Sequence, residues 1–111
     1  MSKEAELLQG SLDLLILKAL SLGPMHGFGV SLRIQDLSRD VLHVLQGSLY
    51  PGLHRLEHQG YIQSEWGTSD NNRRAKFYSL TKAGAARLRT ELASWRRVTQ
   101  AVGWVLAAER A

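Results

Sequence analysis

Residues 47–80 read GSLYPGLHRLEHQGYIQSEWGTSDNNRRAKFYSL, and the fold can be inferred from them. The first part predicts a short helix, with Ser48 as its N-cap, Pro51 in its first turn and Gly60 at its end. Three leucines recur at helical spacing and predict its buried face: Leu49, Leu53 and Leu56.

The opposite face of this helix is polar. At about 100° per residue, it holds Pro51, His54, Arg55 and His58, with Tyr50 at its edge. Apart from the proline, these side chains donate hydrogen bonds and none is aliphatic. We therefore expect this face to bind a partner rather than to pack in the core.

Two runs with strand-like composition follow, Tyr61 to Trp66 and Ala75 to Leu80. The turn between them, residues 67–74, is rich in Gly, Asp and Asn. Three cations lie on the predicted hairpin: Arg73, Arg74 and Lys76. A helix with a polar outer face, followed directly by a basic hairpin, is typical of a winged helix-turn-helix, whose helix enters a major groove while the hairpin reaches phosphates. The alternative is a small α+β packing unit with a solvated basic turn.

The composition is that of one domain with a single core, because the chain has 111 residues. Its formal charge of +4 and pI near 9.9 permit a polyanionic partner. The absence of cysteine excludes disulfides and thiolate metal sites. No signal peptide is evident in residues 1–10, and the longest apolar run, Leu14 to Leu17, cannot span a bilayer. We expect a cytoplasmic protein that is not inserted in a membrane.

The segments before residue 47 predict further helices. Residues 3–9 suggest a short helix, interrupted at Gly10-Ser11, and residues 12–22 a second that is apolar on nearly all sides and needs cover on every face. A third helix is expected from Gly27 to Leu37, with Phe28 on its apolar side. Residues 41–45 are expected to form a strand that pairs with the hairpin.

A long final helix is predicted from the cap at Thr81 to about Leu106, interrupted at Gly103. Six of its residues, all but Thr99 apolar, alternate spacings of four and three, as in a short heptad seam: Leu88, Leu92, Trp95, Thr99, Val102 and Leu106. Since this rod exceeds what a small domain can cover, we expect it to pair with its own copy. The alternative is that it packs back on residues 12–22 of its own chain.

The histidines raise the question of a metal site. His54 and His58, at i and i+4, have chelating spacing, and His43 or Glu57 would supply a third ligand. However, the chain has no HExxH motif, and two exposed polar donors explain the pair equally well. It also lacks a glycine-rich phosphate loop and an evident Ser-His-Asp set. We therefore predict no enzyme, no catalytic residues and no cofactor.

Three segments together resemble the PadR family of transcriptional regulators: LDLLILKALSLGPMHGFGVSLRI, GSLYPGLHRLEHQGYIQSEWG and NNRRAKFYSLTKAG. The similarity covers roughly residues 10–95 and points to the compact subfamily with one C-terminal helix. It implies a homodimeric, DNA-binding and usually repressing protein, with the dimer formed by the final helix. In this resemblance, Tyr50 and Pro51 match the recognition helix, and the three hairpin cations match the wing.

The sequence thus predicts a mainly α protein with a small β-hairpin. Residues 1–80 would form a winged helix-turn-helix domain and residues 81–111 a dimerisation helix, together one compact unit. The expected DNA-binding residues are Ser48, Tyr50, Pro51, His54, Arg55, Arg73, Arg74 and Lys76. The expected dimer contacts are Leu12, Ile16, Leu88, Leu92, Trp95, Val102 and Leu106.

The predicted function is a regulator that binds a pseudo-palindromic double-stranded operator as a homodimer. We expect a repressor that a small aromatic or other apolar effector releases from DNA. Trp95 would be the effector contact at the dimer centre, unless it simply fills the core. Two other classes stay open: a winged-helix module that docks proteins, and a metal-responsive sensor using His54 and His58.

Overall fold

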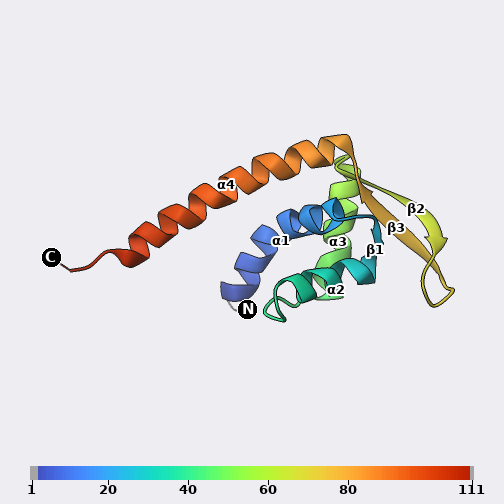
Figure 1. Ribbon diagram of the computed structural model, residues 1–111, viewed down its shortest axis with the longest axis horizontal. Coiled ribbons are helices and arrows are strands. Elements are labelled where there is room, and N and C mark those ends of the chain that lie inside the picture. Colours follow the sequence, from blue (N-terminus) through green and yellow to red (C-terminus); the bar gives the residue numbers. More distant parts are fainter. Residues whose placement is uncertain (1–2, 111) are drawn as a thin grey trace.

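The computed structural model describes residues 3–110, and for residues 3–10 only the helical backbone. Its elements follow in this order: α1 (Lys3–Ser21), β1 (Met25–His26), α2 (Gly27–Leu37), α3 (Gln46–His58), β2 (Ile62–Thr68), β3 (Arg74–Leu80) and α4 (Lys82–Ala107). Helices α1 to α3 gather into one body, the β2–β3 hairpin extends from one end of it, and α4 runs past α1 and out into solvent (Figure 1). This is the expected α+β winged helix-turn-helix.

The core lies where α1, α2 and α3 meet the base of the sheet. Its buried apolar side chains are Leu12, Ile16, Leu17, Ala19, Leu20, Val30, Ile34, Leu49, Leu53, Leu56, Ile62 and Tyr78. All three leucines predicted for the inner face of α3 are among them, which confirms that prediction. The expectation for Phe28 was wrong: its side chain is 50% exposed, on the outer side of α2.

Helix α1 is continuous through Gly10 and Ser11, so the predicted break there is wrong. A single glycine inside a helix costs only about 1 kcal/mol relative to alanine, which is too little to end it. The helix ends before Gly23, whose φ of 135° turns the chain. α1 then lies against α2, α3 and α4, which explains why it is apolar on most sides.

The sheet is antiparallel with strand order β1-β3-β2. The short strand β1 pairs through Met25 with Tyr78 and through His26 with Phe77. Residues 41–45 form no strand, so the pairing predicted for them is wrong. The turn at Gly23 brings residues 25–26 beside β3, whereas residues 41–45 lead directly into α3, with Leu45 as its N-cap.

Helix α4 begins as predicted, because Thr81 caps it by accepting a hydrogen bond from the Gly84 N–H at 3.0 Å. Gly84 itself is buried against the start of β2: a Cβ added there would lie 1.9 Å from the carbonyl oxygen of Tyr61. The helix continues unbroken through Gly103, so the predicted interruption is wrong. Its far half extends the molecule to 62 × 27 × 23 Å.

No helix within residues 3–110 combines the length and apolar character needed to cross a membrane.

Candidate nucleic-acid interface

Helix α3 has one buried face and one open face. It begins at Gln46, with Leu45 as N-cap and no side-chain cap, so Ser48 lies inside the first turn and is not the cap. Pro51 lies a turn further in than predicted, inside the helix, where its missing N–H leaves one backbone hydrogen bond unmade. Gly60, with φ of 83°, ends the helix as predicted.

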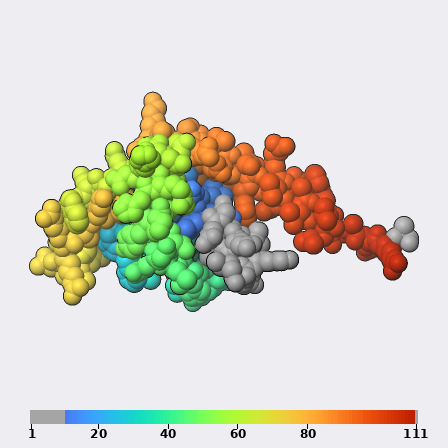
Figure 2. All heavy atoms as spheres, turned by 180° about the vertical axis from the view of Figure 1, so that it is seen from behind, coloured from blue at the N-terminus to red at the C-terminus, as the bar shows by residue number. Residues whose placement is uncertain are grey.

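The open face of α3 contains the residues that the sequence placed there. Pro51, His54 and His58 are exposed, and none of the three forms a side-chain hydrogen bond or ion pair with the described residues. Seen from behind, α3 occupies the middle of one face of the molecule in green, and the yellow tip of the hairpin stands beside it (Figure 2). A long, straight partner can therefore contact helix and hairpin together. His58 was not among the predicted DNA-binding residues, although its helical spacing placed it on this face.

Tyr50 lies at one edge of the open face and joins α3 to α2. A Cβ added at Gly27 would lie 2.7 Å from Cε1 of Tyr50, so this glycine leaves the space that the phenol ring occupies. Next to it, His26 caps α2 by accepting a hydrogen bond from the Gly29 N–H at 3.0 Å. Tyr50 therefore packs closely against the start of α2.

Arg55 lies at the other edge and turns toward α1. Its Nη2 is 2.6 Å from Oδ1 of Asp13, and the two side chains are 49% and 39% exposed. Half-exposed ion pairs are worth little in stability. In the absence of DNA, Asp13 nevertheless engages the Arg55 guanidinium, and this contact links the recognition helix to α1.

Glu57 ties the end of α3 to the hairpin. It accepts a hydrogen bond from the Ser64 hydroxyl and forms an ion pair with Lys76, whose Nζ is 3.7 Å from Oε1. Burial, and next the nearby charge of Glu57, raise the pKa of Tyr78 in the same corner. These contacts fix the hairpin relative to α3, and Lys76 is engaged within the protein itself.

We call the β2–β3 hairpin, residues 62–80, the wing. Its strands are longer than predicted: β2 reaches Thr68 and β3 starts at Arg74, so the turn is only residues 69–73. Asn72 takes a φ of 60° in that turn, as predicted for an asparagine. Arg73 and Arg74 are exposed at the tip, and Arg74 Cζ lies 4.8 Å from the ring centroid of Trp66.

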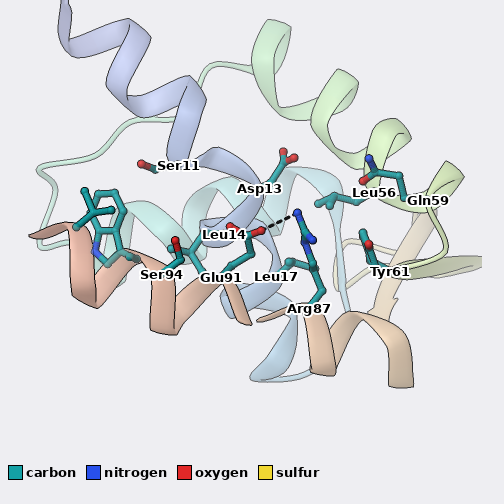
Figure 3. A pocket seen from close by; sticks show the side chains of 12 residues that line it. Ser11, Asp13, Leu14, Leu17, Leu56, Gln59, Tyr61, Arg87, Glu91 and Ser94 are labelled. Atoms are coloured by element: carbon teal, nitrogen blue, oxygen red, sulfur yellow. Dashed lines mark ion pairs between the residues drawn. The ribbon is translucent and has the colours of Figure 1, made fainter. Parts of the chain in front are cut away.

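A cavity of about 380 Å³ lies between α1, the end of α3 and α4 (Figure 3). Arg87 and Glu91 form an ion pair of 2.7 Å on its α4 side, and the Arg87 Cζ lies 5.6 Å from the ring centroid of Tyr61. Asp13, the partner of Arg55, also lines it. The remaining lining residues are Ser11, Leu14, Leu17, Leu56, Gln59, Ser94, Trp95 and Val98.

The far half of α4 carries an uncovered apolar stripe. Four of its exposed residues follow helical spacings of three and four, and we call them the α4 stripe: Trp95, Val98, Val102 and Val105. In the predicted seam, Leu88 and Leu92 are half-buried, Leu88 against the core of its own chain, whereas Leu106 is exposed. Leu12 and Ile16, predicted as dimer contacts, are buried in the core.

No group of three potential metal ligands exists among residues 11–110. The two ligands considered as a third partner for His54 and His58 are engaged elsewhere. His43 Nε2 lies 2.7 Å from the Asp40 carbonyl oxygen, and Glu57 bonds to the wing. The geometry therefore offers no support for the metal-sensor alternative.

Comparison with known proteins gives a consistent result. Residues 16–90 match the model of the transcriptional regulator PadR-like family. The transcriptional regulator Rv3488 of Mycobacterium tuberculosis is 46% identical over 54 residues, which cover 49% of this chain and 50% of that protein.

Solved structures match over nearly the whole chain, including the following two. A PadR family transcriptional regulator from Eggerthella lenta is 30% identical, with a TM-score of 0.78 over 95% of this chain and 89% of its own. A PadR-like transcriptional regulator from Bacillus cereus is 27% identical, with a TM-score of 0.80 over 94% and 99%.

Proposed function

The chain belongs to the PadR-like family of transcriptional regulators, and from this membership we propose that it recognises a specific double-stranded DNA operator through α3 and the wing. The protein is then a regulator without catalytic activity that acts in the cytoplasm. The observation that carries the proposal is the open face of α3, with uncommitted donors at His54 and His58, beside a wing whose tip carries Arg73 and Arg74. A helix of this kind fits the major groove while the wing meets phosphates.

The two elements have different roles in this proposal. Arg73, Arg74 and Lys76 supply affinity, because phosphates are the same in every sequence. His54 and Arg55 contact base edges in the major groove. Tyr50, Ser48 and Pro51 lie beside them and contact the sugar-phosphate backbone of the DNA. To reach a base edge, Arg55 must leave Asp13 and bind an acceptor on that base. Its partner therefore differs between the DNA-free and the DNA-bound protein.

Alanine substitutions separate these roles. Arg73→Ala and Arg74→Ala should each weaken binding to all duplexes alike and lower the slope of log K against log salt by about one. Lys76→Ala should change less, because its ammonium already pairs with Glu57. Arg55→Ala should cost about 1–3 kcal/mol and relax the preference at one base pair. Titration of a selected operator and a random duplex, at several salt concentrations, measures both effects.

Arg89→Ala is the matched control, since it removes the same charge from an exposed position on α4. It should leave affinity and salt slope close to those of the wild type. If wing and helix variants changed both duplexes by one common factor, the division of roles would be wrong. If the wild type shifted no duplex at any salt concentration, the chain would instead be a protein-docking module.

We also propose that the protein is a homodimer joined by the α4 stripe. Two-fold symmetry would present two copies of α3 to half-sites about 34 Å apart, that is, to a pseudo-palindromic operator. The apolar stripe supports this, because an uncovered row of apolar side chains on a protruding helix needs a partner.

The proposed regulation is repression relieved by a small aromatic effector. Supporting this, Trp95 lines a cavity that also contains Asp13, the partner of Arg55. An indole face adds about 0.5–1.5 kcal/mol per stacked aromatic ring. A ligand that binds the DNA-free state more tightly would shift the protein away from DNA.

Fluorescence tests the effector site. Planar dyes and phenolic compounds should quench tryptophan emission of the wild type, and this quenching should be largely lost in Trp95→Ala. Trp104→Ala removes an indole from the opposite side of the same helix and should retain the quenching. Equal quenching in wild type and Trp95→Ala would leave Trp95 as a packing residue.

A further inference from the structure

Trp66 is a large aromatic residue that the core does not explain. Its side chain is 61% exposed although it lies within a strand. The register places Trp66 opposite Lys76 and Thr68 opposite Arg74, and residues opposite each other in an antiparallel pair share a face. Ile62 and Tyr78 lie on that same face nearer the base of the wing, where they are buried. Trp66 and Arg74 therefore lie on the continuation of the core-side face, beyond the part that the body covers.

Arg74 rests on the ring of Trp66. The 4.8 Å distance from Cζ to the ring centroid is well within the range for a cation–π contact. Arginine commonly stacks its planar guanidinium on aromatic faces, which leaves the N–H groups along its edge available. Among residues 11–110, Arg55, Lys76 and Arg87 pair with carboxylates, whereas Arg74 pairs with none. Its charge and its donors are thus free to meet a partner.

We propose that Trp66 is a positioning residue that holds Arg74 ready for a DNA phosphate. An exposed arginine normally samples many rotamers, and ordering it on binding costs conformational entropy. A ring beneath the guanidinium restricts that freedom before DNA arrives, so less is lost when the phosphate is bound. The preceding residue, Arg73, has no aromatic partner among the described residues. It therefore serves as the comparison for an arginine that is not held by a ring. The inference rests on the proposed function, since it assigns the phosphate to DNA.

The test is a double-mutant cycle measured by titration of labelled duplex. Trp66→Leu should weaken binding about three- to tenfold, and Trp66→Phe, which keeps an aromatic ring, should recover most of the loss. In the Arg74→Ala background, Trp66→Leu should have little further effect. In the Arg73→Ala background, Trp66→Leu should weaken binding by the same factor as it does in the wild type.

A second measurement needs no DNA. The side-chain protons of Arg74 should show an upfield ring-current shift in the NMR spectrum of the free protein. This shift should vanish in Trp66→Leu and persist in Trp66→Phe, while the amide spectrum of the body stays unchanged. A wild type without the shift would show that the stack does not form, and would overturn the proposal.

The binding data overturn it in two other ways. If Trp66→Leu weakened binding equally with and without Arg74, Trp66 would contact DNA by itself and would not position Arg74. If the wild type and Trp66→Leu bound the operator equally, Trp66 would have no role, while the proposed function would stand. A wild type that bound no duplex would overturn the proposed function and the phosphate role together.

Discussion

Val102→Glu is expected to convert the proposed dimer into monomers and to weaken binding to a duplex with two half-sites by at least about 100-fold. Val102 lies in the middle of the α4 stripe and is 49% exposed in the single chain. A two-fold axis through the stripe would bring two added carboxylates together in an apolar contact, where an unpaired charge is costly. Two linked modules typically exceed one in apparent affinity by a factor of about 10²–10⁴, which the monomer loses.

Light scattering after gel filtration and titration of the two-half-site duplex measure these effects. Gln100→Glu is the matched control, because it adds the same charge on the other side of the same helix. It should remain dimeric and bind DNA as the wild type does. A monodisperse dimer of Val102→Glu with unchanged affinity would show that the stripe does not join the subunits.

Gly84→Ala is expected to cost about 1–3 kcal/mol or more of unfolding free energy. The added Cβ would lie 1.9 Å from the Tyr61 carbonyl oxygen and 2.9 Å from Leu80 Cδ1. The Tyr61 carbonyl has little freedom to move, because it accepts the Thr81 N–H at 3.1 Å. The helix must therefore shift away from the sheet, which also disturbs its packing on α1.

Urea unfolding followed by circular dichroism measures the loss. Gly103→Ala is the control for a glycine in the same helix, since nothing lies within 4 Å of an added Cβ there. That substitution should stabilise the protein by about 0.5–1 kcal/mol, as alanine does inside helices. Equal stability of Gly84→Ala and the wild type would show that α4 can accept a side chain at position 84 without loss of packing against Tyr61.

The features that sequence reasoning predicted well depend on local patterns. The spacing of Leu49, Leu53 and Leu56 is enough to identify the buried face of α3, because a helix repeats every 3.6 residues. Thr81 as N-cap was equally clear, since its hydroxyl bonds within the first turn. The open face of α3 and the basic wing followed from the same local rules.

The features that it missed depend on distant parts of the chain. The pairing of Met25 with Tyr78 follows from the turn at Gly23, and no local pattern distinguishes it from the β-branched residues 41–45. Arg55 has Asp13 as its partner, 42 positions away, so its engagement was not visible in the sequence.

Two further misses had partial signals. The aromatic composition that indicated β2 gave Trp66 a place in a strand, but not the stack with Arg74, which requires the register. Ser48 had the composition of a cap, yet α3 starts earlier, at Gln46.

Because α4 is long, a small tilt of this helix produces a large displacement at its other end. Its 26 residues, at 1.5 Å each, give a rod of about 39 Å. A tilt of about 5° about its far end moves the near end by about 3 Å, close to the rise of one base pair. In a dimer joined at the far ends, each winged domain is carried by such an arm. A small change of angle where the two α4 helices meet would therefore displace the recognition helices by several ångströms. They would then no longer match the two half-sites of the operator.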